Sequence, residues 1–447
     1  MKLFKLTLLF SILLSSCTSI GLAANKTPDS NSNSNSNLTS SSSFTPSSPV
    51  PLNSYGAVDI NANVPLSAQV PAKPIGFKDP SITPLAQIFS QDLPLPPTLN
   101  AKSYLLMDAK TGAVLAGDNL NERLAPASLT KLMLLYITEQ QLAAGNIHLN
   151  DPITVQPVAW ATGGSRMFLK PGMQVTVKVL IPGIIVDSGN DAAVTLALHI
   201  AGTQAAMVDM MNQAAQKLGM TNTHFSDVMG LPAPNHYSSA YDLGLLARAI
   251  VTQYPQYLSW YDQKWYTFNG IKQPNFNKLL FIYPYALGLK TGSTSSAGYS
   301  LVSAAKMPGN NMTLIGVVLD TPSGDDSAAD SKALLTYGFN FFSTQQLYTA
   351  DQTLSMPKVY FGQNPTTPIG TQNDFAIVLP KNLIQQLSTS IDLPKVIKAP
   401  LAKNQTIGNI NIKLDNQTIM SIPAVALSDN PSGGFFTKLS DHLALWF

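Results

Sequence analysis

The sequence is short of the residue types on which many enzymes depend. One cysteine, Cys17, occurs in 447 residues, which excludes an internal disulfide framework and a cysteine-ligated zinc or iron–sulfur site. Glutamate is nearly absent, because Glu122 and Glu139 are 2 of the 25 acidic residues and the other 23 are aspartates. The 5 histidines are scattered and form no HExxH pair, which argues against a histidine-built metal site. We expect chemistry that needs no metal and no cofactor.

Charge is also scarce, and its two signs are balanced. Charged residues make up 12% of the chain, about half the usual share of ~25%. The 27 Lys and Arg residues against 25 acidic ones leave a formal charge of +2, so nucleic acid is not an expected partner. The length is ample for about three domains.

The first 24 residues are typical of an export signal. Lys2 and Lys5 precede an apolar run at 6–14 that is too short to span a bilayer as a mature helix. Two processing routes fit the region that follows. Leu-Ser-Ser-Cys at 14–17 has the form of a lipobox, which would make Cys17 a lipidated first residue, whereas the small residues at 21–24 suit an ordinary signal peptidase.

The segments at the two ends of the mature chain differ in pattern. Residues 25–82 are rich in Ser, Asn and Pro and predict a disordered tether, because they cannot bury enough apolar area to offset the entropy of ordering. Residues 433–447 open with two glycines and continue with apolar residues at helical spacing. We interpret this end as an amphipathic helix that lies on a membrane surface, with a packing helix as the alternative.

Residues 83–345 combine strand and helix patterns. Alternating apolar residues predict one hairpin at 103–116 and another at 298–319. Helical patterns occur at 129–142, 192–201, 204–218, 241–252 and 331–342. This order predicts an α+β domain, an antiparallel sheet with helices against its faces. Beyond it, short alternating runs at 375–379, 405–414 and 418–425 predict a small all-β domain over 346–432.

The first candidate for chemistry is Ser128-Leu-Thr-Lys131, at the start of the buried helical run. Ser128 and Lys131 are three residues apart, so both side chains emerge on one helix face. A serine hydroxyl is a poor nucleophile unless a base lies beside it. A lysine can be that base if its pKa falls, which burial and a second cation would both cause. Alone the motif is weak, because a capping serine followed by a surface lysine is common.

Two further tripeptides strengthen the interpretation. Ser188-Gly-Asn190 begins 57 residues after Lys131, just before a predicted helix. Lys290-Thr-Gly292 begins 102 residues after Ser188, before the strand pattern that starts at residue 298. Each tripeptide is common by chance, but the ordered set of three is typical of serine penicillin-recognising enzymes.

On these motifs the chain resembles the low-molecular-mass penicillin-binding proteins of class C, the periplasmic serine-type D-alanyl-D-alanine carboxypeptidases. The likeness runs from about residue 103 to 447 and includes PASLTKLM (126–133), SGNDA (188–192) and LKTGSTSSAGYSLV (289–302). It implies a penicillin-recognising serine transpeptidase-like domain followed by a small β domain. It also implies removal of the terminal D-Ala from peptidoglycan pentapeptide stems, acylation by β-lactam antibiotics, and a place on the periplasmic side of the bacterial inner membrane.

The resemblance assigns roles to the matching positions. Ser128 would attack the penultimate D-Ala carbonyl, Lys131 would take its proton, and Ser188 would relay a proton to the leaving D-Ala. The substrate-binding positions implied by the resemblance are Asn190, Lys290, Thr291, Gly292 and Ser293. Among these, the Ser293 N–H would form the oxyanion hole together with the N–H of Ser128.

Two positions depart from the family pattern. Family members often carry histidine directly after Lys-Thr-Gly, where this chain has Ser293. Many also carry an arginine between the last strand and the closing helix, whereas residues 320–330 contain no arginine and 4 aspartates. Carboxylate recognition would then depend more on Lys290 and Thr291, and Arg166 is a candidate to compensate.

The same residues bear on three alternative functions. A class A-like β-lactamase is disfavoured, since its deacylating glutamate has no counterpart after Glu139. A D,D-endopeptidase that cleaves peptidoglycan cross-links stays open as an alternative, and the intact motif set disfavours a non-enzymatic wall-binding protein. The histidines are interpreted as structural, with His199 and His224 in core or cap positions and no constellation at His148, His236 or His442.

Overall fold

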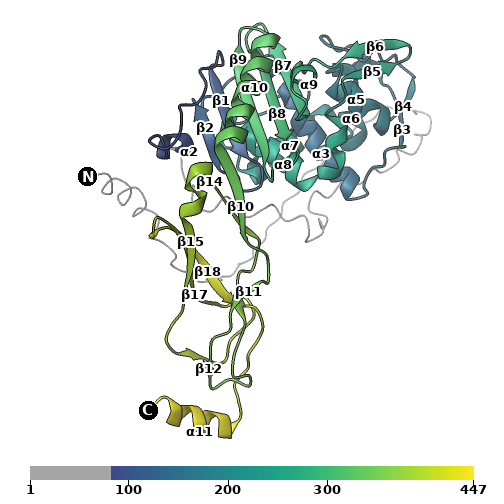
Figure 1. Ribbon diagram of the computed structural model, residues 1–447. Coiled ribbons are helices and arrows are strands. Elements are labelled where there is room, and N and C mark those ends of the chain that lie inside the picture. Colours follow the sequence, from purple (N-terminus) through teal and green to yellow (C-terminus); the bar gives the residue numbers. More distant parts are fainter. Residues whose placement is uncertain (1–81, 447) are drawn as a thin grey trace, which may run out of the picture. The chain divides into compact units, whose positions relative to one another are not determined.

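The computed structural model describes residues 82–446. The predicted signal peptide (1–24), Cys17 and nearly all of the predicted tether (25–82) therefore lie outside the described residues. The described part begins with a loop and the short helix α2 (Leu85–Ile88), and its principal elements are labelled in Figure 1.

A five-stranded antiparallel sheet forms the centre of the catalytic region, in the order β2-β1-β9-β8-β7. Its strands are β1 (Ser103–Asp108), β2 (Val114–Asp118), β7 (Ala286–Thr294), β8 (Gly298–Lys306) and β9 (Thr313–Thr321). Two small strand pairs stand apart from it, β3 (Pro152–Thr154) with β4 (Gln174–Thr176), and β5 (Trp265–Phe268) with β6 (Ile271–Pro274). Because β7 ends the sheet order, one side of this strand is a free edge of the main sheet.

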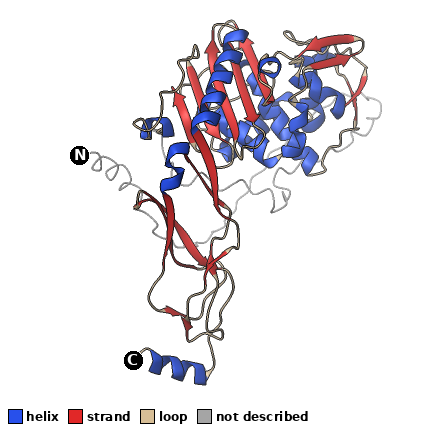
Figure 2. Cartoon of the chain, viewed as in Figure 1, coloured by secondary structure: helices blue, strands red, loops and turns tan. Residues whose placement is uncertain are grey.

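Helices cover both faces of the main sheet (Figure 2). The longer helices are α3 (Lys131–Ala143), α5 (Val177–Ile185), α6 (Asn190–Ala201), α7 (Gln204–Leu218), α8 (Ala240–Gln253) and α10 (Gly324–Phe341). The shorter helical segments are η3 (Ala127–Thr130), α4 (Pro157–Trp160), η4 (Pro255–Trp260) and α9 (Leu279–Ile282). Successive residues of β1 show the division, since Leu105 packs in the core shared with α8 and Leu106 in the core shared with α10. The predicted α+β architecture is confirmed.

The strand that carries Lys-Thr-Gly is a difference from the sequence prediction. The motif lies inside β7 rather than just ahead of the first strand of a hairpin, so the hairpin pattern at 298–319 is the second and third strand of a longer antiparallel run. Glycines and polar residues interrupt the sequence of β7, which hides its strand pattern.

The closing helix also starts earlier than predicted. Helix α10 begins at Gly324 and not at residue 331, because Ser323 caps it by accepting a hydrogen bond from the Asp326 N–H at 3.1 Å. Asp325 and Asp326 occupy the first turn, where the helix dipole favours negative charge. Most of the segment expected between the last strand and this helix is thus the helix itself, and the connection is only residues 322–323.

The C-terminal region is a small all-β domain, as predicted. Its main sheet has the order β11-β13-β18-β17-β15, and two further strand pairs are β10 with β14 and β12 with β16. The longer strands are β10 (Phe342–Tyr348), β14 (Phe375–Pro380), β15 (Leu387–Asp392), β17 (Thr406–Leu414) and β18 (Gln417–Ala426). The shorter elements are β11 (Thr353–Ser355), β12 (Val359–Tyr360), β13 (Ile369–Gly370), η5 (Lys381–Gln386) and β16 (Ile397–Lys398). Helix α11 (Phe435–Ala444) ends the described chain.

Candidate active site

The turn at the start of α3 brings Ser128 and Lys131 together. Lys131 Nζ lies 2.9 Å from Ser128 Oγ, as their spacing along the helix predicted. Ser128 is partly exposed, whereas the Lys131 side chain is fully buried. The turn is strained, because Ala127 directly before the serine has a φ of +48°. A reactive hydroxyl is therefore presented to solvent above a buried amine.

The electrostatic surroundings of Lys131 disfavour its charged form. Burial and the nearby positive charge of Lys290 hold the pKa of the Lys131 amine well below its ordinary value, although Asp227 and Asp191 oppose the shift. A neutral amine has a lone pair that can accept a proton, so this lysine can serve as a base.

A second serine–lysine pair joins residues that are far apart in the sequence. Lys290 Nζ donates to Ser188 Oγ at 3.0 Å and to the Thr291 carbonyl at 3.1 Å. Burial lowers the pKa of Lys290 to about 7, while the charge of Asp187 opposes that shift. Ser188 is also held in a rarely populated conformation, with a φ of +53° directly before α6.

The other predicted site residues, Asn190 and Thr291 to Ser293, lie on α6 and β7. Asn190, the first residue of α6, donates through Nδ2 to the Gly163 carbonyl at 2.6 Å. Gly292 packs on the serine turn, since a Cβ there would lie 2.8 Å from the Pro126 carbonyl oxygen. Only glycine lets β7 approach the turn this closely. Thr291 is partly buried and Ser293 is exposed on the same strand.

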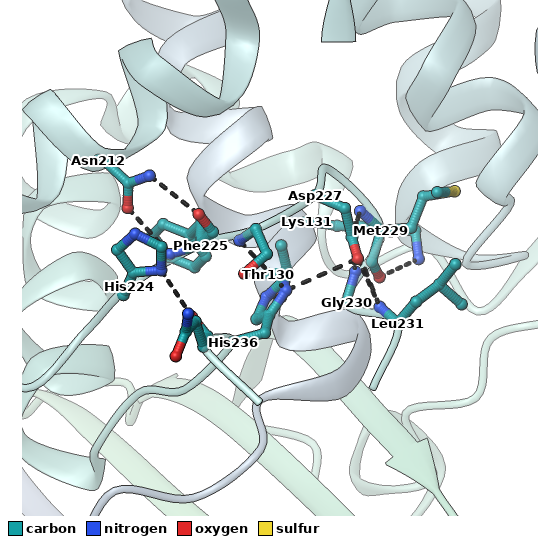
Figure 3. Close-up of polar contacts among 12 residues, drawn as sticks. Thr130, Lys131, Asn212, His224, Phe225, Asp227, Met229, Gly230, Leu231 and His236 are labelled. Carbon is teal, nitrogen blue, oxygen red and sulfur yellow. Dashed lines mark hydrogen bonds and ion pairs between the residues drawn. The ribbon is translucent and has the colours of Figure 1, made fainter. Parts of the chain in front are cut away.

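The loop at 227–231 also contacts the buried Lys131. The sequence pattern did not predict that this loop belongs to the site. Lys131 Nζ donates to the Met229 carbonyl at 3.0 Å (Figure 3). Gly230 has a φ of +91°, and a Cβ there would lie 1.7 Å from the Ala127 carbonyl oxygen. The loop backbone therefore contacts both the serine turn and the lysine. No local motif announces this role, because the contacting group is a main-chain carbonyl.

Comparison with known proteins decides the family. Residues 90–323 match the family model described as D-alanyl-D-alanine carboxypeptidase, and residues 342–432 match the one described as Penicillin-binding protein 5, C-terminal domain. The chain belongs to the D-alanyl-D-alanine carboxypeptidase family. The predicted class of enzyme, a serine-type hydrolase of this family, is confirmed.

Relatives of this carboxypeptidase share both regions. The chain is 41% identical to D-alanyl-D-alanine carboxypeptidase DacA of Escherichia coli K12 over 363 residues, which cover 79% of this chain and 90% of that protein. It is 34% identical to the carboxypeptidase DacF of Bacillus subtilis, with 77% and 90% covered. The crystal structure of penicillin-binding protein 5 from Haemophilus influenzae is similar with a TM-score of 0.73 at 39% identity, covering 76% of this chain and 100% of that one.

The turn between β7 and β8 borders a pocket beside the Lys290-Thr-Gly292 motif. Ten residues line this cavity of 610 Å³, among them Ser293 and Asp320. Asp320 has a φ of +58° and is the one charged residue in the lining. Arg166, the candidate to compensate for the missing family arginine, donates to the Thr162 carbonyl. Its loop borders the site, since Asn190 N–H donates to the Ser165 carbonyl at 2.8 Å.

The two glutamates have structural partners. Glu139 accepts a hydrogen bond from the Tyr261 hydroxyl at 2.6 Å, and Glu122 pairs with Lys102 at 2.7 Å. Within residues 82–446, no group of three His, Cys, Asp or Glu side chains is placed to hold a metal ion.

Proposed function

We propose that this carboxypeptidase removes the terminal D-Ala from peptidoglycan pentapeptide stems through an acyl-enzyme on Ser128. The observation that carries the proposal is the 2.9 Å approach of the buried Lys131 amine, whose pKa is lowered, to the Ser128 hydroxyl. This pairing supplies what a serine nucleophile lacks, a base held within reach of its proton.

In the acylation step, Lys131 accepts the Ser128 proton while Oγ bonds to the penultimate D-Ala carbonyl carbon. The negative charge that develops on the carbonyl oxygen is stabilised by the N–H groups of Ser128 and Ser293. Removing one such donor typically lowers the rate by about 10²- to 10³-fold. The C–N bond then breaks as Ser188 gives its hydroxyl proton to the departing D-Ala amine. The proton that Lys131 took from Ser128 passes to Ser188 Oγ, so Lys131 is neutral again before deacylation.

The neighbours of Ser188 hold the substrate in this proposal. Lys290 and Thr291 receive the terminal carboxylate, and Asn190 holds a substrate amide. The closeness of Gly292 to the serine turn supports a substrate that lies along β7, with its scissile bond over Ser128. The 3.0 Å hydrogen bond from Lys290 Nζ orients Ser188 Oγ and supports the role of this hydroxyl in passing a proton to the leaving group.

The same groups act in reverse during deacylation. Water adds its oxygen to the acyl carbon and gives a proton to the base, and the bond to Ser128 Oγ then breaks as this oxygen recovers a proton. A β-lactam ring presents a strained amide to the same hydroxyl, so its opening leaves a penicilloyl group on Ser128. Both reactions need no glutamate, in keeping with the composition of the chain.

A covalent-adduct experiment tests the assignment of the nucleophile. We expect the purified protein to gain the mass of one penicillin, and Ser128→Ala to gain none. Ser303→Ala is the matched control, because Ser303 is a buried serine of β8 whose hydroxyl donates to the Gly316 carbonyl in the sheet. An adduct on Ser128→Ala, or its loss in Ser303→Ala alone, would contradict the assignment.

A substrate assay separates carboxypeptidase from endopeptidase action. Incubation with a pentapeptide that ends in D-Ala-D-Ala should release free D-Ala, whereas cleavage of cross-linked dimers alone would favour the endopeptidase. Arg166→Ala in the same assay tests whether this side chain replaces the missing family arginine. A raised KM supports that role, and unchanged kinetics would exclude it.

We propose export by the signal at 1–24 and a working place on the periplasmic side of the inner membrane. No helix within the described part of the chain is long and apolar enough to cross a membrane. Helix α11 supports a surface attachment, because its Phe435 and Phe436 are 75% and 83% exposed. On the opposite face of the helix, Asp441 Oδ2 accepts a hydrogen bond from the Phe361 N–H at 2.6 Å, which turns the apolar face outward.

Vesicle sedimentation tests this attachment. Leu439→Asp, on the apolar face, should abolish binding to phosphatidylethanolamine–phosphatidylglycerol vesicles. Thr437→Asp, on the polar face, adds the same charge and should bind like the unaltered protein. Equal binding by both variants would contradict the attachment. The intact mass of the mature protein decides between a lipidated Cys17 and cleavage after residue 23 or 24.

A further inference from the structure

His236 is buried between the serine turn and the loop at 227–231. The sequence pattern had assigned it no partner residues. Its side chain is 1% exposed, and its two ring nitrogens face two different elements. Nε2 lies 2.8 Å from the hydroxyl of Thr130, and Nδ1 lies 3.6 Å from Asp227 Oδ2 (Figure 3). A histidine in this place links the helix of the nucleophile to the loop behind the base.

The assignment of the ring proton follows from the neighbours. Asp227 is a carboxylate, so a proton on Nδ1 faces it favourably, while a bare nitrogen lone pair would be repelled. Nε2 then accepts the hydrogen bond from the Thr130 hydroxyl. The Ser226 N–H also points at Nδ1, but its 3.4 Å distance makes it the weaker interaction.

Asp227 transmits this link to the loop main chain. Its Oδ1 accepts hydrogen bonds from the N–H groups of Met229 and Gly230, both at 2.6 Å. Burial alone would raise the pKa of the Asp227 carboxyl, but His236 and these two N–H groups together lower it. The carboxylate thereby fixes the loop conformation in which the Met229 carbonyl faces Lys131.

The orientation of the Met229 carbonyl matters for the base. A neutral lysine amine has two N–H donors and one lone pair. When a carbonyl oxygen accepts one of the N–H groups, the directions in which the lone pair can point are limited. The Met229 oxygen lies 3.0 Å from Lys131 Nζ, and Ser128 Oγ lies 2.9 Å from the same atom. The carbonyl thus turns the lone pair toward the serine hydroxyl.

We propose that His236 is a positioning residue for acylation: by bridging Thr130 and Asp227 it holds the Met229 carbonyl on Lys131 and aims the amine at Ser128. This inference rests on the proposed function of Ser128 and Lys131. His236 itself touches neither the reacting atoms nor the substrate-binding positions among its recorded contacts.

Two conservative substitutions test the contacts of His236 with Thr130 and Asp227 separately. The amide of His236→Gln can reach the place of Nε2 and keep the Thr130 contact, whereas the amide of His236→Asn can reach the place of Nδ1 and keep the Asp227 contact. His224→Gln is the matched control, since His224 is an exposed histidine of the same segment and its Nδ1 lies 2.6 Å from the Asn235 carbonyl oxygen. Leu246→Ala is a stability control, because it truncates a fully buried side chain of α8 and leaves His236, Thr130 and Asp227 unaltered.

The experiment follows acylation by a fluorescent penicillin at increasing concentration. Both His236 variants should lower the rate constant at saturation by about 10- to 100-fold, the size expected for a misplaced catalytic group, and leave the half-saturating concentration within about twofold. Thr130→Val should also lower the acylation rate constant. The double variant Thr130→Val with His236→Asn should be no slower than His236→Asn alone, because that variant already lacks the hydrogen bond to Thr130. His224→Gln and Leu246→Ala should acylate at the unaltered rate.

The outcomes separate this inference from the proposed function. If the unaltered protein acylates and the His236 variants match it, the positioning role is overturned and the function stands. The positioning role is also overturned if Leu246→Ala, at the same loss of Tm, slows acylation as much as the His236 variants do. It is overturned as well if the effects of Thr130→Val and His236→Asn on the acylation rate are additive. If the unaltered protein forms no adduct, the proposed function itself fails.

Discussion

The active site contains two serine–lysine pairs that look alike and are built differently. Lys131 and Ser128 approach to 2.9 Å within one turn, and Lys290 and Ser188 approach to 3.0 Å across 102 residues of sequence. Both lysines are buried, so the desolvation that lowers their pKa is similar. The difference lies in the neighbouring charges, and it suits one lysine to accept a proton and the other to bind an anion.

Neighbouring charge explains how one residue type serves two purposes. The positive charge of Lys290 lowers the pKa of Lys131 further, well below the ordinary value. Lys290 instead has Asp187 beside it, whose charge opposes the effect of burial and leaves its pKa at about 7. A lysine that is half protonated near neutrality can hold a carboxylate, while the more strongly shifted one is free to act as a base.

Loss of the base should give the largest effect. Lys131→Met keeps the volume of the side chain and removes the amine, so we expect the rate of penicillin acylation to fall by about 10²- to 10⁴-fold. The Tm should hold or rise, because a buried amine is replaced by an apolar group. Acylation that survives Lys131→Met would mean that another group takes the serine proton.

Loss of the second lysine should be smaller and of another kind. Lys290→Met removes a charged partner of the substrate carboxylate, so we expect the KM for the pentapeptide to rise by about 10- to 100-fold. Lys278→Met is a control, since that exposed lysine pairs with Asp325 on the surface. A fall in kcat with an unchanged KM would break the distinction between the two pairs.

The charge of Asp187 offers a finer test. With the pKa of Lys290 at about 7, its ammonium is present below that pH and lost above it, so substrate binding should weaken as pH rises through about 7. Burial raises the pKa of Asp187 itself to about 7, so the two groups titrate together. Asp187→Asn removes the carboxylate that supports the ammonium, so the weakening should begin at a lower pH. We would measure KM from pH 5.5 to 8.5, with the exposed Asp209→Asn as the control. An unshifted profile would show that Asp187 does not set the charge of Lys290.

Glu139 shows burial without a charge partner, and its loss should affect activity least. Burial raises the pKa of Glu139 to about 8 from an unfolded value near 4.5. Between these pH values the folded protein keeps a proton that the unfolded chain has lost, so stability falls as pH rises from about 4.5 to 8. The full shift corresponds to about 5 kcal/mol at most. Glu139→Gln should therefore raise the Tm at pH 9, have little effect on it at pH 4.5, and leave acylation unchanged. A pH-independent effect on Tm would contradict this account.

Local patterns predicted the parts of the site that depend on local geometry. The spacing of Ser128 and Lys131 was enough to place them together, because helix geometry sets the side-chain directions three residues apart. A helix beside Ser188-Gly189-Asn190 was likewise predicted, although α6 begins at Asn190, two residues earlier than the predicted start at 192. Strand β7 and the first turns of α10 were missed, because glycines hide the strand pattern in one and aspartates obscured the helix start in the other.

Long-range contacts could not be predicted in this way. His236 is buried between two partners, Thr130 and Asp227, which lie 106 and 9 residues away from it in the sequence. The base also depends on a main-chain carbonyl of Met229, which any residue type could supply. A pattern of residue types carries no information about such a contact.

The sequence by itself determined the candidate chemistry: near absence of glutamate, a single cysteine in the predicted export signal, and three ordered motifs indicate a serine nucleophile with a lysine as its base. It determined this because helix spacing and side-chain chemistry are local properties. Only the tertiary structure decided which of the two buried lysines carries the lower pKa and which histidine lies behind the serine turn. Those depend on which charges and polar groups meet in the folded core, where removal of water makes each neighbour count.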